Sequence, residues 1–220
     1  MKMTIKTFAG RPLLCSLLLA TLALPALQGC FPIMAGGMTA GALMVSDRRT
    51  SGSYVEDEGI EWKVSDRISQ QFGDRVHINV TSYNRQVLLT GEVPDAATRD
   101  AVASAAGRVE NVRTVSNETT VAGSSSLTSR GNDAYLTSKV KARFVDANQF
   151  SANLVKVVTE ANTVYLMGLV TKEEAKYATE LARTTGGVQK VVTLFEIISF
   201  EEARKYDTRD KSKQSDANTR

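Results

Sequence analysis

Histidine and cysteine are scarce in this chain, and their scarcity excludes several kinds of chemistry. The 220 residues contain two cysteines and one histidine, His77, which stands in a β-branched run. A zinc site needs several imidazole or thiolate ligands, and a serine hydrolase needs a histidine beside its serine. No serine lies in a Gly-x-Ser-x-Gly turn, and no glycine-rich loop carries the lysine of a phosphate-binding site. We therefore expect no catalytic residue, no metal and no cofactor, and we interpret the chain as a non-enzymatic protein.

The chain also lacks an apolar run long enough to cross a bilayer. The longest run near the N-terminus, residues 13–24, is well short of the roughly 20 residues that a transmembrane helix requires. It follows three cations, Lys2, Lys6 and Arg11, an order typical of a signal peptide that is removed after export. We therefore predict a signal peptide over residues 1–29.

The tetrapeptide at the end of this leader indicates where the protein works. Leu27-Gln28-Gly29-Cys30 resembles the bacterial lipoprotein box, in which cleavage precedes a cysteine that receives acyl chains on its sulfur and its new amino group. The resemblance implies that Cys30 is lipidated, and each buried methylene of its acyl chains contributes about 0.8 kcal/mol to membrane binding. Phe31 occupies the position at which an aspartate would retain such a lipoprotein in the inner membrane. The resemblance therefore implies the periplasmic face of the outer membrane.

Loss of the leader removes the basic excess of the chain. Residues 1–29 carry three of the 27 basic residues and none of the 24 acidic ones, so the mature chain is balanced. A general nucleic-acid binder would need a concentrated basic surface, and we expect no nucleic-acid partner. Cys15 leaves with the leader and Cys30 is consumed by lipidation, so we predict no disulfide.

Composition divides the mature chain into two blocks with polar segments around them. Residues 31–46 are uncharged and rich in glycine, alanine and methionine, residues 47–59 are polar and turn-prone, and residues 123–126 are Gly-Ser-Ser-Ser. The C-terminal segment is too polar to fold alone, and we expect a fraying helix end followed by disorder. The predicted organisation is a lipidated tether over residues 30–55, a first domain over 56–122, a linker over 123–131, a second domain over 132–200 and a disordered tail over 201–220.

The two blocks repeat one pattern of elements. Each begins with an amphipathic-helix pattern in which apolar residues recur at every fourth position. These residues are Ile60, Val64, Ile68 and Phe72 in the first block, and Leu136, Val140 and Phe144 in the second. Two β-branched runs follow, and the second run contains Gly91 or Gly168, which predicts a bulge or a close backbone approach. A helical stretch and a third strand complete each block, so the pattern predicts the order αββαβ twice.

This order and its motifs resemble the BON domain, a small module of bacterial envelope proteins. The motifs are Leu89-Thr90-Gly91-Glu92-Val93, Met167-Gly168-Leu169-Val170 and Gly131-Asn132-Asp133. The resemblance implies an α+β fold with two tandem BON domains, each a three-stranded mixed sheet with two helices on one face. It also implies an outer-membrane lipoprotein that supports envelope integrity, is enriched at the division site and is linked to regulated peptidoglycan cleavage.

Charge and one helix point to a membrane contact in the second block. Residues 56–122 have seven basic and eleven acidic residues, whereas residues 130–200 have nine basic and seven acidic ones. Tyr135, Lys139 and Arg143 recur at every fourth position beside the apolar stripe of the first helix in the second block. An aromatic ring beside cations, each worth about 1 kcal/mol near anionic lipid, fits a peripheral membrane contact. A solvated helix face is the other interpretation of these charges.

The BON resemblance favours the membrane interpretation. In tandem BON lipoproteins this helix of the second domain binds anionic phospholipids such as phosphatidylglycerol and cardiolipin. The matching positions here are Tyr135, Lys139, Val140, Lys141, Arg143 and Val145. Tyr135 stands where the family often has tryptophan and Lys141 where it has arginine, so the resemblance implies a contact that is retained but weaker.

Two hypotheses of function follow. The first is a non-enzymatic outer-membrane lipoprotein that binds anionic phospholipid through the first helix of the second domain. The second is an adaptor for outer-membrane assembly or for peptidoglycan-cleaving enzymes, which would bind an envelope protein through the acidic first domain and the apolar residues 34–45. A secreted hydrolase is a third alternative, and its activity would depend on His77.

Overall fold

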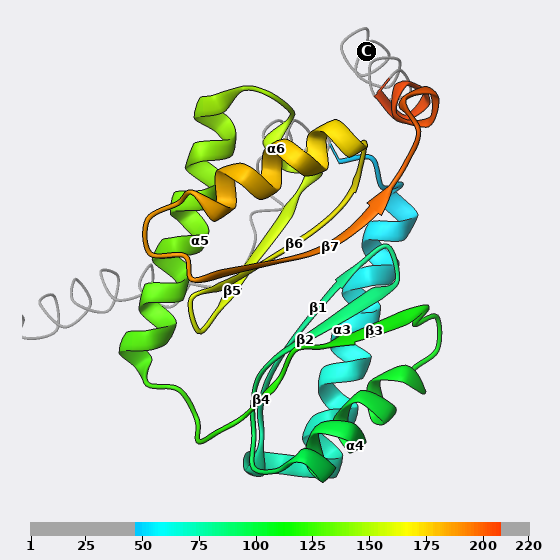
Figure 1. Ribbon diagram of the computed structural model, residues 1–220. Coiled ribbons are helices and arrows are strands. Elements are labelled where there is room, and N and C mark those ends of the chain that lie inside the picture. Colours follow the sequence, from blue (N-terminus) through cyan, green and yellow to red (C-terminus); the bar gives the residue numbers. More distant parts are fainter. Residues whose placement is uncertain (1–46, 208–220) are drawn as a thin grey trace, which may run out of the picture. The chain divides into compact units, whose positions relative to one another are not determined.

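Two successive α+β repeats make up the part of the chain that the computed structural model describes, residues 47–207 (Figure 1). The predicted signal peptide, Cys30, the rest of the predicted tether up to residue 46 and residues 208–220 lie outside this range. The first repeat contains α3 (Ser51–Phe72), η2 (Gly73–Arg75), β1 (His77–Tyr83), β2 (Gln86–Val93), α4 (Ala96–Gly107), β3 (Thr114–Asn117) and β4 (Thr120–Val121). The second contains α5 (Leu127–Ala147), η3 (Ala152–Leu154), β5 (Lys156–Glu160), β6 (Thr163–Val170), α6 (Lys172–Arg183) and β7 (Lys190–Ile197). The predicted α+β class and the αββαβ order are confirmed.

Each repeat contains a mixed sheet. β1 pairs antiparallel with β2, and a third strand, which is interrupted between β3 and β4, pairs parallel with β2. In the second repeat β5 pairs antiparallel with β6, and β7 pairs parallel with β6. Helices α4 and α6 make the long crossovers that parallel strands need. The middle strands β2 and β6 are consequently buried along almost their whole length.

The predicted apolar stripes of the first helices face the sheets. The buried residues of these stripes are Ile60, Val64 and Ile68 in α3, and Leu136, Val140 and Phe144 in α5. Alternate residues of β2 and β6 complete the two cores beneath the helices. The remaining alternate residues form a third buried cluster that joins Tyr83 and Leu88 of the first repeat to Tyr165 and Met167 of the second. Each sheet therefore has helices on one face and apolar contacts with the other repeat on the opposite face.

A buried aspartate on each first helix holds the hairpin turn of its repeat. Residues 84–85 have φ of 49° and 67°, and residues 161–162 have φ of 47° and 59°, values typical of a two-residue hairpin. Asp57 accepts the backbone N–H groups of residues 84–85 at 2.7 and 2.8 Å. Asp133 accepts those of residues 161–162 at 3.0 and 2.9 Å. This shared role was not predicted, although both aspartates stand three residues before the first buried residue of the apolar stripe.

Gly91 and Gly168 occupy the close backbone approaches that were predicted for them. Gly91 has φ of 111°, and a Cβ added there would lie inside van der Waals contact with the carbonyl oxygen of His77. A Cβ added at Gly168 would overlap the carbonyl oxygen of Leu154. Both glycines lie opposite the start of the preceding strand, where the backbone passes too closely for any side chain.

Arg48 connects the N-terminal side of the first repeat to the second repeat. Its side chain is only 4 % exposed. The guanidinium donates to both carboxylate oxygens of Glu174 at 2.6 and 2.9 Å, and to the carbonyl oxygen of Leu169 at 3.1 Å. It also pairs with Asp207 in the helix that ends the described chain, at 3.3 Å. We refer to Arg48, Glu174 and Asp207 as the Arg48 cluster.

Arg49 is held in a similar way within the first repeat. It pairs with Asp47 at 2.7 Å and with Asp57 at 2.8 Å. Its guanidinium carbon also lies 4.1 Å from the centre of the Tyr83 ring, a cation–π distance. Residues 47–49 are therefore part of the folded domain and not of a turn-prone tether, which corrects the sequence-based boundary.

Helix caps explain why both long helices begin earlier than the sequence analysis predicted. α3 begins at Ser51, inside the predicted tether, because the Thr50 side chain accepts the N–H of Ser53 at 3.1 Å. α5 begins at Leu127, inside the predicted linker, because Ser126 caps it in the same way. The capping residues were visible in the sequence, but their polar neighbours resembled linkers.

The first part of the predicted tail is helical. Residues 200–207 form a helix whose start is capped by reciprocal hydrogen bonds between Ser199 and Glu202. Ala203 is buried at 2 % exposure, and Asp207 belongs to the Arg48 cluster. Residues 201–207 are therefore the expected helix end and do not belong to a disordered tail, because contacts from distant parts of the chain stabilise this short polar helix.

Acid is expected to destabilise the fold through Asp57 and Glu174. Burial alone would raise the pKa of each carboxylate. At Asp57, hydrogen bonds from the backbone N–H of Arg85 and the hydroxyl of Ser82 hold the pKa below its ordinary range. At Glu174, the Arg48 guanidinium has the same effect on the pKa. Because the unfolded carboxylates bind protons more readily, this stabilisation is complete above about pH 5 and is lost as the pH falls through the folded-state pKa values.

Urea unfolding between pH 7 and pH 3 measures this dependence. The Asp57→Asn variant should be less stable at pH 7 and should lose less further stability in acid than the parent chain. An identical acid-induced loss in the two proteins would exclude Asp57 as a source of the pH dependence.

Candidate functional site

Helix α5 carries all six residues predicted to contact phospholipid, and the structure separates them into three groups. Val140 is completely buried in the core of the second repeat, so its predicted contact with lipid is wrong. Its position in the apolar stripe, at the spacing of Leu136 and Phe144, is the physical reason. Lys139 and Arg143 form a second group, and Tyr135, Lys141 and Val145 form a third.

Arg143 caps the C-terminal end of α6, and Lys139 binds the loop that follows it. Arg143 donates to the carbonyl oxygen of Leu181 at 2.8 Å and to the hydroxyls of Thr184 and Thr185 at 3.1 and 3.0 Å. Lys139 donates to the carbonyl oxygen of Gly186 at 2.9 Å. Cations that bind the last carbonyls of a helix stabilise it through these hydrogen bonds and through its dipole. These two cations therefore have a structural function that the helical spacing could not indicate.

Apart from these two cations, the exposed charged residues of α5 are Lys141 and Asp146. We define the exposed face of α5 as Ala134, Tyr135, Ser138, Lys141, Ala142 and Val145, which fall within one arc of the helix. Tyr135 is 62 % exposed and Val145 is 65 % exposed. Lys141 makes no ion pair or hydrogen bond with any residue between 47 and 207, whereas Lys139 lies 5.9 Å from the centre of the Tyr135 ring. Leu127, 84 % exposed, extends the same arc toward the start of the helix.

The equivalent helix of the first repeat presents a different surface. Alignment of Asp57 with Asp133 places Trp62, 69 % exposed, at the position of Ser138. Val55, 71 % exposed, lies two turns earlier on the same side of α3. Exposed Glu58 and half-buried Asp66 flank this surface, which is therefore acidic where the exposed face of α5 carries Lys141. Trp62 was not among the predicted site residues, although its position outside the apolar stripe of α3 indicates an exposed tryptophan.

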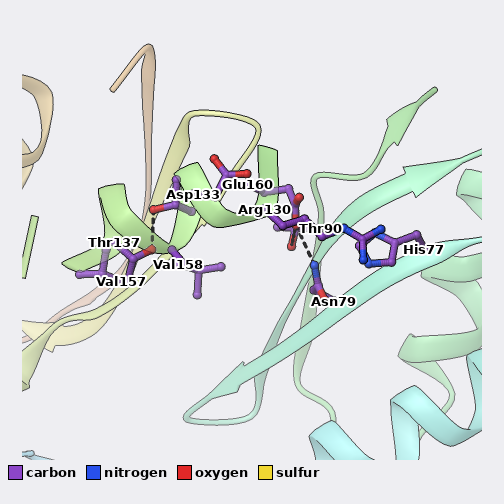
Figure 2. A pocket seen from close by; sticks show the side chains of 11 residues that line it. His77, Asn79, Thr90, Arg130, Asp133, Thr137, Val157, Val158 and Glu160 are labelled. Carbon is purple, nitrogen blue, oxygen red and sulfur yellow. Dashed lines mark hydrogen bonds between the residues drawn. The ribbon is translucent and has the colours of Figure 1, made fainter. Parts of the chain in front are cut away.

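A cleft of about 430 Å³ lies between β1 and β2 of the first repeat and α5 and β5 of the second (Figure 2). Its polar side chains are largely engaged with one another. His77 Nδ1 lies 2.9 Å from Glu92 Oε2, and Glu160 accepts hydrogen bonds from Asn79 at 2.8 Å and Thr90 at 3.2 Å. The two hydrogen bonds to Glu160 help to hold the two repeats together, and His77 is paired within the first repeat.

Between residues 47 and 207, no helix has the length and apolarity of a membrane span. Over the same residues, no three histidine, cysteine or acidic side chains gather in an arrangement suited to a metal ion.

The duplicated αββαβ order, the paired glycine strands and the aspartate-held hairpins define one module that occurs twice. A family model described as "BON domain" matches residues 56–123 and 132–199. The chain belongs to the BON domain family. The two repeats are therefore its first and second BON domains, and the exposed face of α5 belongs to the second.

Two named proteins are similar to this chain over most of its length. "Outer membrane lipoprotein DolP" of Haemophilus influenzae is 35 % identical over 174 residues, which is 78 % of this chain and 90 % of that protein. The "21 kDa hemolysin" of Actinobacillus pleuropneumoniae is 30 % identical over 154 residues, which is 69 % of this chain and 79 % of that protein. The first similarity supports an outer-membrane lipoprotein of the BON family, and neither relative is named as an enzyme.

Among solved structures, CdsD of Chlamydia trachomatis, a structural protein of the type III secretion system, covers 71 % of this chain and 98 % of its own. The sequence identity is 15 % and the TM-score is 0.26, which is too low to carry an argument about this chain.

Proposed function

We propose that this protein is a non-enzymatic outer-membrane lipoprotein, anchored at Cys30 on the periplasmic face, that binds anionic phospholipid through the exposed face of α5. The observation that carries the proposal is the composition of that face. It presents Tyr135 and Val145, both more than half exposed, beside three small residues and Lys141, a cation with no ion pair or hydrogen bond among residues 47–207. The low charge and the single cation fit the boundary between lipid headgroups and acyl chains.

The length of this face suits a helix that lies along a membrane surface. From Ala134 to Val145 the helix rises about 17 Å, at 1.5 Å per residue. Tyrosine places its ring among headgroups and its hydroxyl in water, and Val145 can enter the acyl boundary. Lys141 would pair with a lipid phosphate, worth about 1 kcal/mol near an anionic surface. Phosphatidylglycerol and cardiolipin are the anionic phospholipids that we propose as ligands.

The acyl anchor and the helix would act together. Acyl chains at Cys30 restrict the protein to one membrane, so that even a weak second contact is formed at a high effective concentration. The second domain has two more basic than acidic residues between 130 and 200, while the first has four more acidic than basic residues between 56 and 122. This asymmetry would turn the second domain toward anionic lipid. Enrichment at the division site and support of envelope integrity are the cellular consequences that we propose.

Cosedimentation with vesicles tests the lipid contact without the acyl anchor. The chain from Asp47 to Arg220 retains the Arg48 cluster and should bind vesicles that contain phosphatidylglycerol or cardiolipin, but not neutral vesicles, and it should dissociate at high salt. Lys141→Glu should weaken binding by about tenfold or more, because one attraction is replaced by a repulsion. Tyr135→Ser should weaken binding by about tenfold through lost apolar burial.

Lys190→Glu is the matched control for the charge change. Lys190 is exposed in the same domain but lies on β7, outside the exposed face of α5. It should retain most of the binding, whereas equal losses in Lys141→Glu and Lys190→Glu would show a diffuse electrostatic effect and contradict the proposed face. Substitutions of Lys139 or Arg143 are less informative, because they remove hydrogen bonds to the loop after α6 or to the end of α6 itself.

An adaptor function is the second candidate, and exposed Trp62 on α3 favours it. Tryptophan is enriched among the residues that dominate protein interfaces, and an acidic surround disfavours anionic lipid as its partner. In envelope crosslinking, an adaptor should capture one stoichiometric protein whatever the lipid composition, and Trp62→Ser should abolish that capture. A crosslinking pattern that is unchanged by Trp62→Ser would contradict an adaptor surface on α3.

A further inference from the structure

A groove of about 470 Å³ runs between α6 and β7 of the second BON domain, on the helix side of the sheet. Phe195 and Ile197 of β7 and Ala175 of α6 line its apolar part. Ile197 is 47 % exposed, which is unusual for a strand residue that faces a helix layer. The groove is separate from the exposed face of α5, because it lies on different elements.

One wall of the groove is an open sheet edge. β7 extends over eight residues and pairs with β6 along its whole length. Within residues 47–207, no strand pairs with its other side. A long, uninterrupted edge presents N–H and C=O groups of alternate residues to any extended chain that approaches. Proteins ordinarily shorten, interrupt or cover such an edge.

The first BON domain closes the equivalent edge. Asn117 of β3 donates its side-chain N–H to the carbonyl oxygen of Arg99 on α4 at 2.8 Å, and Arg99 donates to the carbonyl oxygen of Asn117 at 3.2 Å. Asn117 also accepts from the N–H and the hydroxyl of Thr119, where the strand is interrupted before β4. These side-chain contacts cover the outer edge of β3 and connect this strand to α4.

The second domain lacks these closing side chains. Asn117 of β3 pairs with Leu89 of β2, and Thr193 of β7 pairs with Leu166 of β6. Leu89 and Leu166 are equivalent positions of the two middle strands, so Thr193 is the equivalent of Asn117. Arg99 stands four residues after the N-cap of α4, the position that Ala175 holds in α6. Both replacements are shorter, and the groove is the space that they leave.

Charge along the groove favours an acidic occupant. Lys172 and Lys176 line it, and neither makes a hydrogen bond or ion pair with another residue of the chain between 47 and 207. Glu180 also lines it, but its carboxylate is paired with Arg183 at 3.0 Å. The rim therefore offers two free cations above an apolar floor.

We propose that this groove binds an extended, acidic and apolar peptide segment of a partner protein, which adds to the sheet as a strand beside β7. Backbone hydrogen bonds to the open edge would supply affinity. Alternate side chains of the peptide would enter the groove against Phe195 and Ile197, and its carboxylates would pair with Lys172 and Lys176. The inference is independent of the proposed lipid contact.

Selection from a display library of short random peptides on the full-length lipoprotein in detergent micelles tests the proposal. The enriched sequences should alternate apolar residues and carry aspartate or glutamate, and the synthetic consensus peptide should slow hydrogen exchange of β7 amides. Lys172→Glu combined with Lys176→Glu should weaken the consensus peptide by about tenfold or more.

A closing variant provides the sharper control. Ala175→Arg combined with Thr193→Asn installs the side chains with which the first domain closes its own edge, and it should abolish peptide binding while vesicle binding is unchanged. Failure to enrich acidic and apolar peptides, or peptide affinities that neither double variant alters, would overturn the proposal. Self-association that the closing variant abolishes, without peptide enrichment, would also overturn it and assign the edge to a second copy of the chain.

Discussion

Gly91→Ala is expected to lower the free energy of unfolding by about 4 kcal/mol. The φ of 111° is one that residues with a Cβ rarely adopt, and forcing it contributes about 1–3 kcal/mol of strain. The new Cβ would also overlap the carbonyl oxygen of His77, a backbone atom that no side-chain rotation can move. Overpacking of this kind contributes about 1–3 kcal/mol more. The middle strand of the first sheet would have to separate from β1 to admit a single methyl group.

Urea unfolding followed by circular dichroism measures this loss. Gly123→Ala is the matched control, because Gly123 has no neighbour within 4 Å of an added Cβ, and its variant should stay within about 0.5 kcal/mol of the parent. Gly168→Ala should fall between the two, since Gly168 has the backbone overlap without the positive φ. A loss below about 1 kcal/mol in Gly91→Ala would contradict the close approach.

Arg48→Ala is expected to lower the free energy of unfolding by about 3–5 kcal/mol. Removal of one partner from a buried ion pair leaves the other charge desolvated without compensation. Glu174 is only 18 % exposed and accepts two hydrogen bonds from Arg48, and the carbonyl oxygen of Leu169 would lose a donor as well. The variant should also release the helix over residues 200–207, because Asp207 is paired with Arg48.

Arg113→Ala is the control that distinguishes the effect of burying an ion pair from the effect of losing one positive charge. Arg113 pairs with Glu196 at the same 2.6 Å distance, but its side chain is 46 % exposed, and exposed pairs contribute about 0–1 kcal/mol. Denaturant unfolding compares the stabilities, and hydrogen exchange follows the amides of the final helix. Equal losses in Arg48→Ala and Arg113→Ala would show that burial of Arg48 contributes nothing.

The regular parts of the fold were predictable because each rests on local chemistry. The four-residue spacing of Ile60, Val64 and Ile68 already defines a helix face, and Thr171 with Glu174 forms the predicted capping box of α6. The glycines of β2 and β6 marked close approaches because no other residue serves there. These features need only neighbours within a few residues, and the sequence displays them directly.

Contacts between distant residues were not predictable from the same patterns. Arg48 and Glu174 are 126 residues apart, and nothing in the polar segment around Arg48 distinguishes it from a solvated tether residue. Arg143 has the helical position of a surface cation, yet the end of α6 lies where its guanidinium can bind three oxygens. Helical periodicity predicts the direction in which a side chain points, but it does not predict which residues of other elements the side chain contacts.

The candidate site was predicted in part for the same reason. The sequence placed Tyr135 and Val145 on the outer surface of α5, and both side chains are exposed. The predicted lipid-binding residues included Val140, although Val140 also belongs to the predicted apolar stripe of the helix. The structure buries Val140 in the core. The first helices of the two domains also expose different residues. Only the structure shows that Trp62 lies on an acidic surface, and that Lys141 has no partner among residues 47–207.

Paramagnetic broadening of backbone amides by spin-labelled lipid in bicelles that contain phosphatidylglycerol tests the central claim most directly. With the chain from Asp47 to Arg220, we expect broadening to be strongest at Ala134, Tyr135, Ser138, Lys141, Ala142 and Val145, and to disappear in bicelles of neutral lipid. Broadening centred on Trp62 and Val55 of α3, or an absence of broadening with anionic lipid, would contradict a membrane contact through the exposed face of α5.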